Sequence, residues 1–343
     1  MSDAKPAARA RTRARGLKTW SAFGELGRRP TEYETLTHNL NHTTGPVPLE
    51  MGPEVHGNVW LREHRDAMKL TVPDWDAFRD PDALTYGSYI ATQDDQETYV
   101  ERLLERFDRA GHDAALSPAA LDLLASAFTP ARYLAHGLQM LSAYLQQLAV
   151  SSYVGNCAAF QTADQLRRVQ LTAHRTTQLR LVHPDRGFAT AERGTWENAP
   201  AWQPIRRAIE LALVEFDWDR ALVATNLVVK PVADLLLLDQ LSRQAATAGA
   251  ELDALILDSL SLDSQRSRRW TGALVQFLGE ADAGNLRVLQ DYLDEFAPLG
   301  TAMIDAGGTL LAVDGSPAAQ VGAGTRAAWA AFLQQAGLTV RAL

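Results

Sequence analysis

Two short stretches decide the fold of this chain. Residues 163–170 read Ala-Asp-Gln-Leu-Arg-Arg-Val-Gln, and residues 262–268 read Leu-Asp-Ser-Gln-Arg-Ser-Arg. Each stretch lies inside a run of about thirty residues whose apolar side chains recur at helical spacing. The spacing predicts helices over 153–183 and 251–282. Long helices joined by short links predict an all-α bundle.

The polar side chains in these stretches stand where carboxylate-bridged di-iron bundles hold their metal. Such bundles place a Glu-x-x-His pair on each of two helices and a single Glu on each of two others. Here the pairs are Gln165 with Arg168 and Ser264 with Ser267, and each pair shares one helix face. A guanidinium is a permanent cation and the other three side chains are neutral, so all four are degenerate ligand positions. No Glu in the chain is followed by His three residues later. The sequence therefore predicts no metal ligand and no catalytic residue.

A guanidinium on a buried face requires a counter-ion. Asp164 stands one turn before Arg168, at the spacing that favours an ion pair within a helix, and is the predicted partner. Asn226 and Lys230, just before Pro231, are interpreted as polar support for a proline kink. The run Arg266, Arg268 and Arg269 is interpreted as a solvated or interface face.

Charge divides the chain unevenly. The formal net charge of the 343 residues is −8. Residues 1–18 hold six basic residues and one acidic residue, so this arm is +5 and the remainder is −13. An acidic body is the opposite of what nucleic-acid binding requires, so no nucleic acid is expected as a partner. We expect the basic arm to be disordered; no apolar stretch follows it, as a secretory signal would require.

Cysteine and apolar content place further limits. Cys157 is the single cysteine, which excludes disulfide frameworks and cysteine-ligated metal clusters and fits a reduced cytoplasm. Its apolar surroundings predict a buried, inert thiol. No apolar run is expected to reach the roughly 18–20 residues that span a bilayer, so no membrane is expected as a partner. Among the histidines, His38 and His42 have no carboxylate to complete a metal site, and His136 and His174 are expected to be core or interface residues.

Three regions are expected along the chain: a disordered basic arm over 1–18, an extended aromatic and proline-rich segment over 19–80 that packs on a partner subunit, and a helical bundle over 81–343. Three helix starts share a capping residue followed by proline: Asp80-Pro81, Ser117-Pro118 and Thr129-Pro130. The expected helices are 81–111, 118–127, 130–150, 153–183, 203–216, 218–247, 251–282, 285–310 and 324–336.

Several of these stretches also match a known family. The chain resembles the β, or smaller, hydroxylase subunit of soluble bacterial multicomponent monooxygenases, and is most similar to the four-component toluene, alkene and isoprene group. The resemblance covers about residues 17–300 and is absent from the basic arm. The most specific matches are Asn156-Cys157, Gln161-Thr162-Ala163-Asp164, Phe216-Asp217-Trp218 and Asn226-Leu227-Val228-Val229-Lys230-Pro231.

The resemblance implies a ferritin-like, ribonucleotide-reductase-like long-helix bundle with an extended N-terminal arm and no metal site of its own. It implies a homologous α subunit that carries the di-iron centre, a γ subunit, and a second αβγ protomer. A Rieske-type ferredoxin, a reductase and an effector protein would bind the complex, with NAD(P)H, FAD and iron–sulfur groups in the electron-transfer components. The implied reaction inserts one oxygen atom of O2 into an aromatic or alkene hydrocarbon.

Two other functions remain open from the residues. The chain could be a catalytic ferritin-like oxidoreductase with atypical ligands, which iron analysis of the chain distinguishes. It could also be a helical adaptor unrelated to oxygen chemistry, which co-purification with a chain bearing two Glu-x-x-His motifs distinguishes. The substrate, whether toluene, isoprene, propene or another, depends on a different chain.

Overall fold

The computed structural model describes residues 23, 26–40, 54–312 and 317–341. The described residues form helices and connecting loops and contain no β-strand. The expected all-α long-helix bundle is therefore confirmed. The basic arm and the expectation of its disorder lie outside the described residues, as does His42.

The longer helices occur in the expected order, although α3 begins at Tyr86 rather than at 81 and α14 begins at Ala318 rather than at 324. They are α3 (Tyr86–Arg109), α5 (Ala131–Gln147), α6 (Ser152–Val182), α8 (Gln203–Ala212), α12 (Glu251–Ala281), α13 (Ala283–Leu310) and α14 (Ala318–Gln335). The shorter helices are α1 (Glu32–Thr37), α2 (His56–His64), α4 (Pro118–Leu123) and α7 (Glu192–Asn198), with single turns at Trp75–Ala77, Asp113–Ala115, Pro184–Arg186 and Pro200–Trp202.

One continuous helix runs through the middle of the bundle from Trp218 to Ala248, and we call it the central rod. It comprises α9 (Trp218–Leu222), α10 (Lys230–Asp234) and α11 (Leu241–Ala248), separated by π-helical stretches at Val223–Val229 and Leu235–Gln240. A third π-helical stretch, Leu124–Phe128, follows α4. Each π-helical stretch widens the helix locally, which changes the direction of the side chains that follow it.

The central rod corrects the expectation that no apolar run reaches the length of a membrane span. It has 31 residues, and its most apolar 18-residue window has a mean hydropathy of 1.8. Every residue of that window is buried inside the bundle, so the described structure uses this apolar content for a core helix.

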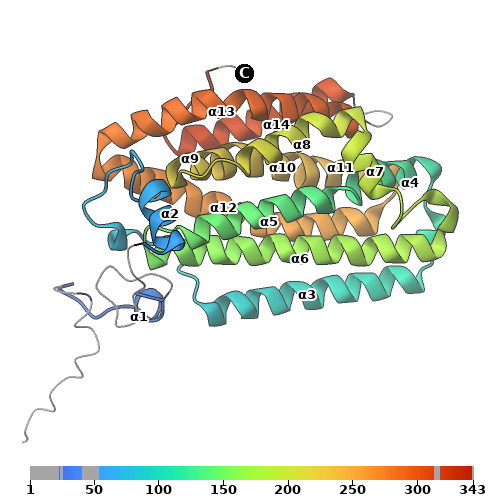
Figure 1. Ribbon diagram of the computed structural model, residues 1–343. Helices are drawn as coiled ribbons and strands as arrows, with labels where there is room; N and C mark the ends of the chain where they lie inside the picture. Colours follow the sequence, from blue (N-terminus) through green and yellow to red (C-terminus); the bar gives the residue numbers. More distant parts are fainter. Residues whose placement is uncertain (1–22, 24–25, 41–53, 313–316, 342–343) are drawn as a thin grey trace, which may run out of the picture.

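The long helices lie lengthwise in layers (Figure 1). Figure 1 shows α3 at one edge, α5 and α6 next to it, and α13 and α14 at the opposite edge. Helix α5 packs along α6, α12 packs against both α6 and α3, and α13 packs on the central rod and on α14. The hydrophobic core is continuous through these layers. Several charged side chains of α6 and α12 are also buried, so they lie in the interior of the bundle beside this core.

Helix starts show which capping predictions were correct. Ser117 caps α4 as expected, because its hydroxyl accepts a hydrogen bond from the amide of Ala120. Thr129 was a wrong prediction: its backbone is already helical and its hydroxyl has no hydrogen-bond partner among the described residues. Asp80 was also wrong, because α3 begins at Tyr86 behind a capping box formed by Thr85 and Ser88.

The described part of the segment over 19–80 lies on this chain's own bundle. The Trp60 indole donates a 3.0 Å hydrogen bond to the Tyr144 hydroxyl, and the Trp75 ring meets the Trp218 ring edge-on at 6.0 Å. Phe78 is buried in the main core. The expectation that this segment also packs on a partner subunit stays a prediction.

Candidate functional site

The four positions predicted to be degenerate ligand positions all face the interior of the bundle. Gln165 and Arg168 on α6 are 4% and 3% exposed, and Ser264 and Ser267 on α12 are 2% and 5% exposed. A buried polar side chain at these positions is costly unless it is paired, so the interior must supply partners. The hydrogen-bond and ion-pair partners of these four side chains decide whether a metal ion could bind here.

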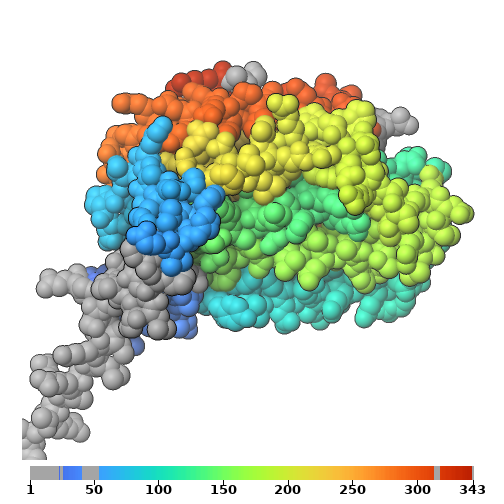
Figure 2. All heavy atoms as spheres, in the orientation of Figure 1, coloured from blue at the N-terminus to red at the C-terminus, as the bar shows by residue number. Residues whose placement is uncertain are grey.

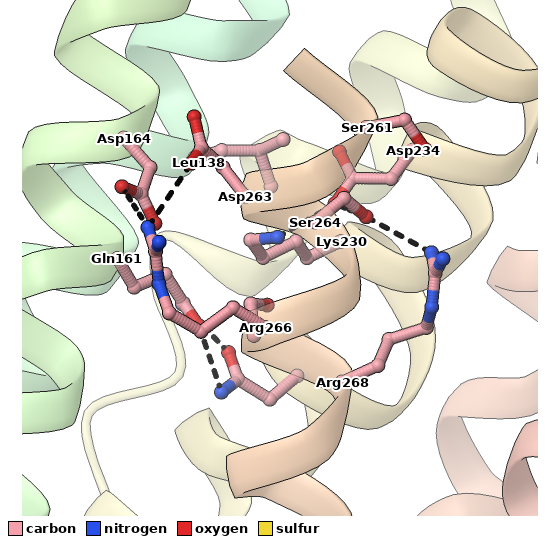
Figure 3. Close-up of polar contacts among 12 residues, drawn as sticks. Leu138, Gln161, Asp164, Lys230, Asp234, Ser261, Asp263, Ser264, Arg266 and Arg268 are labelled. Carbon is pink, nitrogen blue, oxygen red and sulfur yellow. Dashed lines mark hydrogen bonds and ion pairs between the residues drawn. The ribbon is translucent and has the colours of Figure 1, made fainter. Parts of the chain in front are cut away.

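A carboxylate from the central rod joins two of the four positions. Arg168 donates to Asp234 across a distance of 2.9 Å, from Nη1 to Oδ1. Ser264 donates to the other carboxylate oxygen of Asp234 at 2.8 Å, and Lys230 donates to that same oxygen at 2.6 Å. Arg268 closes the group with a 2.9 Å hydrogen bond to the Ser264 hydroxyl. We call these five residues the Asp234 cluster, part of which is seen in Figure 3.

The Asp234 cluster is held by charge. Burial alone would raise the pKa of Asp234, but Lys230 and Arg168 outweigh burial and hold this pKa below its usual range. Burial lowers the pKa of Arg168, although a guanidinium still remains protonated at neutral pH. One anion therefore lies between two cations in the core. The second nitrogen of the Arg168 fork, Nη2, has no hydrogen-bond partner among the described residues.

The predicted pair between Arg168 and Asp164 is wrong. Asp164 instead accepts a short hydrogen bond from Arg266 on α12, and another from the Tyr89 hydroxyl on α3 at 2.9 Å. Figure 3 shows Asp164 and Arg266 meeting on one side of α12, and Asp234 and Lys230 on the other side. Residues one turn apart share a helix face only approximately, so the two side chains of α6 reach partners on different neighbouring helices.

Arg266 also contradicts its sequence interpretation as part of a solvated face. Its side chain is buried between α6 and α12 and pairs with Asp263 as well, at 3.2 Å. Asp263 in turn accepts a 3.0 Å hydrogen bond from Arg167, which also pairs with Glu97 on α3. Of the three arginines in that run, Arg269 is the exposed one.

Further buried polar side chains form ion pairs and hydrogen bonds along α6. Arg175, fully buried, forms ion pairs with Asp253 at 3.0 Å and with Asp113 at 2.9 Å. Near the other end, Gln161 and Asn226 exchange hydrogen bonds, and Asn226 also donates to Thr271 at 3.1 Å. Asn226 thus connects the central rod to α6 and α12, a role that the proline-kink interpretation did not predict.

The remaining candidates from the sequence have no chemical role visible here. Cys157 is buried as expected, and burial raises the pKa of its thiol well above the usual value. His136 and His174 are exposed, so they are not core residues, and the alternative that they are interface residues stays a prediction. His38 packs its ring against the rings of Phe23 and Tyr153.

The donor set at these positions does not fit an iron ion. Ligands for a di-iron centre are carboxylates and neutral imidazoles. The interior here presents the cations Arg168 and Lys230 around Asp234, and the Asp234 carboxylate is already engaged by three donors. Within the described ranges, no group of three or more His, Cys, Asp or Glu side chains is arranged to hold a metal ion. No chemical step is therefore assigned to a metal in this chain.

Comparison with known proteins identifies the family to which this chain belongs. The family model described as methane/phenol/alkene hydroxylase matches residues 60–282. The chain is 38% identical over 304 residues to the hydroxylase component subunit beta of the toluene-4-monooxygenase system of Ectopseudomonas mendocina, covering 88% of this chain and 93% of that protein. It is 24% identical to an oxygenase component of phenol 2-monooxygenase from Pseudomonas sp. strain CF600, covering 68% of this chain and 70% of that protein.

Solved structures agree with this placement. A structure of toluene 4-monooxygenase with toluene bound in its resting active site matches with a TM-score of 0.82 and 37% identity, covering 88% of this chain and 99% of that chain. A chain of phenol hydroxylase from Pseudomonas sp. OX1 matches with a TM-score of 0.82 at 18% identity over the full length of both chains, which shows the shared fold alone.

Proposed function

Because the chain belongs to the methane/phenol/alkene hydroxylase family, we propose that it is the non-catalytic β subunit of the hydroxylase of a multicomponent monooxygenase. The observation that carries this proposal is the Asp234 cluster. Arg168 stands where a histidine ligand would stand, Asp234 is its counter-ion, and Lys230 pairs with the same carboxylate and fills the space beside it. A cluster of this kind ties three helices together without offering a coordination site.

The chain is accordingly a structural partner of a homologous α subunit that carries the di-iron centre. Its relative from E. mendocina is itself described as a beta subunit of a hydroxylase component, which supports this role. Gln165, Arg168, Ser264 and Ser267 are proposed to be degenerate ligand positions, with no catalytic, cofactor-binding or metal-binding residue in this chain. Its contribution to activity is to support the α subunit and the dimer of protomers.

The wider system is proposed on the same basis. A γ subunit and a second αβγ protomer would complete the hydroxylase, and a Rieske-type ferredoxin, a reductase and an effector protein would bind it. NAD(P)H would supply electrons through FAD and iron–sulfur groups in those components. The reaction would insert one oxygen atom of O2 into an aromatic or alkene hydrocarbon, in a reduced cytoplasmic setting; the relatives' names mention toluene and phenol.

Iron analysis of separated subunits tests the proposal. The chain is co-expressed with its candidate α subunit, the complex is purified, and the subunits are separated under conditions that retain bound iron. We expect the iron to remain with the α subunit and this chain to hold a negligible fraction. Stoichiometric iron on this chain, with the absorption spectrum of a bridged iron pair, would establish the catalytic oxidoreductase alternative. Failure to co-purify with any di-iron subunit would favour the adaptor alternative.

A further inference from the structure

One buried tryptophan differs from the others in how its indole nitrogen is paired. Among the described residues, four tryptophans are buried: Trp202, Trp218, Trp270 and Trp329. The indole nitrogens of Trp202, Trp218 and Trp329 each donate to a backbone carbonyl, at 2.7 to 3.1 Å. The indole nitrogen of Trp270, on α12, is buried and has no hydrogen-bond partner among the described residues. A buried donor without a partner is costly, so this N–H requires an acceptor.

The Trp270 side chain lines a small cavity. The cavity offers about 10 Å³ to the centre of a water-sized sphere, which is room for about one water molecule. Eight of its nine lining residues are buried, so it lies in the interior of the bundle. Its polar side chains come from the loop before α3, from α6 and from α12: Asp80, Gln161, Asp164, Arg266, Ser267 and Trp270. An apolar cavity stays dry, whereas a polar cavity with several hydrogen-bonding groups holds water.

Two carboxylates on the cavity wall have unused capacity to accept hydrogen bonds. Asp164 accepts from Arg266 and from Tyr89, and both bonds go to the same oxygen, Oδ1. Asp80 accepts a single backbone hydrogen bond at each of its carboxylate oxygens. An ionised carboxylate offers about four lone-pair sites, so both side chains can accept a further hydrogen bond from a molecule in the cavity.

Ser267 gives a reason for the space. It is one of the four predicted degenerate ligand positions, where a Glu-x-x-His pair would hold a histidine. A serine side chain is much smaller than an imidazole, and Ser267 borders the cavity. The Ser264 hydroxyl donates to Asp234, but the Ser267 hydroxyl forms no hydrogen bond with another described residue. The Asp234 cluster therefore fills the interior at Arg168 and Ser264, and it leaves room at Ser267.

We propose that this cavity is a binding site for one ordered water molecule, which accepts the hydrogen bond of the Trp270 indole and donates its two hydrogens to Asp80 and Asp164. The Ser267 hydroxyl supplies the fourth hydrogen bond, as a donor to the water oxygen. The site satisfies the Trp270 N–H and uses one acceptor position on each carboxylate. Buried waters typically make two to four hydrogen bonds of this kind.

The water molecule would join the N-terminal segment to the bundle. Figure 2 shows residues 54–80, in blue, packed over one end of the bundle against green and orange helices. Asp80 lies where this segment passes into α3, and its backbone amide donates to the Tyr33 hydroxyl at 3.3 Å. A water shared by Asp80, Asp164 and Trp270 fixes that junction to both α6 and α12.

A crystal structure of the full chain, at a resolution that shows ordered water, tests the site directly. We expect one water peak within about 2.7–3.2 Å of the Trp270 indole nitrogen and of a carboxylate oxygen of both Asp80 and Asp164. Three results would overturn the proposal: a cavity without a peak, a peak that reaches only one of the carboxylates, or a Trp270 indole that donates to a protein atom.

A cavity-filling substitution tests the site in solution. Ser267→Thr adds one methyl group, which is similar in size to a water molecule. If the methyl group displaces a bound water, the Trp270 N–H loses its partner, and the melting temperature should fall by about 2 °C. In a Trp270→Phe background the same substitution should lower the melting temperature less than half as much, because no indole donor remains. Filling a dry cavity would instead raise the melting temperature and overturn the proposal.

A second background separates loss of water from crowding. Trp202→Phe also removes a buried indole, but Trp202 donates to the Ser126 carbonyl and does not line the cavity. Ser267→Thr should therefore cost the same in the Trp202→Phe background as in the unaltered chain. Equal losses in all three backgrounds would mean that the added methyl group only strains the packing, and the water site would have to be abandoned.

Discussion

Arg168 of α6 and Asp234 of the central rod lie 2.9 Å apart in the centre of the bundle, and both side chains are almost completely buried. Arg168 is one of the four predicted degenerate ligand positions. Lys230 shares the same carboxylate, and Asp234 is the only carboxylate among the described residues that pairs with Arg168 or Lys230, whereas Asp239 pairs with Arg268 at the longer distance of 3.9 Å. The stability of this region therefore depends most on Asp234.

This asymmetry predicts an order of destabilisation. Removing one partner from a buried ion pair costs about 3–5 kcal/mol, because an uncompensated charge remains. Asp234→Asn leaves both Arg168 and Lys230 without a counter-ion, so it should lower the free energy of unfolding more than Arg168→Met does. Urea unfolding of the full chain measures both values. As a control, Glu105→Gln, which breaks the exposed pair with Arg109, should change stability by less than about 1 kcal/mol.

The same variants separate structure from catalysis. If the chain is a structural subunit, Arg168→Met should lower the yield or the melting temperature of the complex. Turnover per intact complex should remain near that of the unaltered complex, because no chemistry takes place at this position. A fully assembled Arg168→Met complex whose turnover had fallen by orders of magnitude would show that this chain takes part in catalysis.

Asp164 predicts a pH dependence of stability. Burial, and then the nearby carboxylate of Asp263, raise the pKa of Asp164 to about 7 in spite of Arg266. Between an unfolded value of about 3.9 and this folded value, the folded chain binds a proton that the unfolded chain has released. The contribution of Asp164 to folding stability is therefore fully present below about pH 4 and declines as the pH rises towards 7.

Unfolding free energies measured at pH 5 and pH 8 test this sign. Asp164→Asn should reduce the loss of stability between the two values, because the titrating group is gone. Asp305→Asn serves as the matched control, since the Asp305 side chain is 65% exposed and its ion pair with Arg326 lies at the surface. An unchanged pH dependence in Asp164→Asn would show that Asp164 does not titrate in this range.

Two glycines predict opposite effects of the same substitution. In α13, a Cβ added at Gly307 would lie 2.6 Å from Leu236 of the central rod, so Gly307→Ala should destabilise the chain by about 1–3 kcal/mol. In α12, Gly272 has open space around the same position, so Gly272→Ala should stabilise by about 0.5–1 kcal/mol. Thermal unfolding measures both shifts. A stabilised Gly307→Ala variant would mean that α13 packs less closely on the rod than described.

The sequence predicted the bundle because helical periodicity is local, and it predicted the burial of Arg168 because that residue shares the inward face of α6. It did not predict the partner. Asp234 is 66 positions away, and only the packing of the central rod against α6 brings it close. The spacing of four residues within one helix pointed to Asp164 as the partner of Arg168, but in the structure Asp164 pairs with Arg266 on α12.

The Asp80-Pro81 prediction failed for a related reason. Asp80 does accept backbone hydrogen bonds, but from Asp82 and Leu84 at 3.0 and 3.3 Å, which closes a turn rather than a helix. An aspartate before proline is compatible with both structures. The second signal, Thr85 three residues before Ser88, departs from the usual capping box because Ser replaces Glu or Gln, and it marks the true start of α3.

Truncation tests the N-terminal regions. Removal of residues 1–17 should leave the complex with the α subunit intact, because the predicted arm contributes no apolar anchor. Removal of residues 1–60 should break the complex, because it deletes the aromatic segment predicted to pack on the partner. The bundle itself should remain helical, since Trp75 and Phe78 still pack on it. Size-exclusion chromatography and circular dichroism make the two measurements, and an intact complex after the larger deletion would refute the predicted role of the segment.

Restoring the expected ligands should not restore a metal site. A chain carrying Gln165→Glu, Arg168→His, Ser264→Glu and Ser267→His would regain both Glu-x-x-His pairs, yet the Lys230 ammonium would remain 2.6 Å from Asp234, inside the same interior. A fixed cation there repels a metal ion, and ligands bind metal tightly only when the surrounding groups orient them. We expect the purified variant to contain less than about 0.1 iron per chain by elemental analysis, against about 2 for a full di-iron site. Adding Lys230→Gln to the variant removes that cation and should raise the iron content measurably. If the variant with four substitutions bound about two irons per chain while Lys230 was still present, the Lys230 ammonium would not be what prevents metal binding.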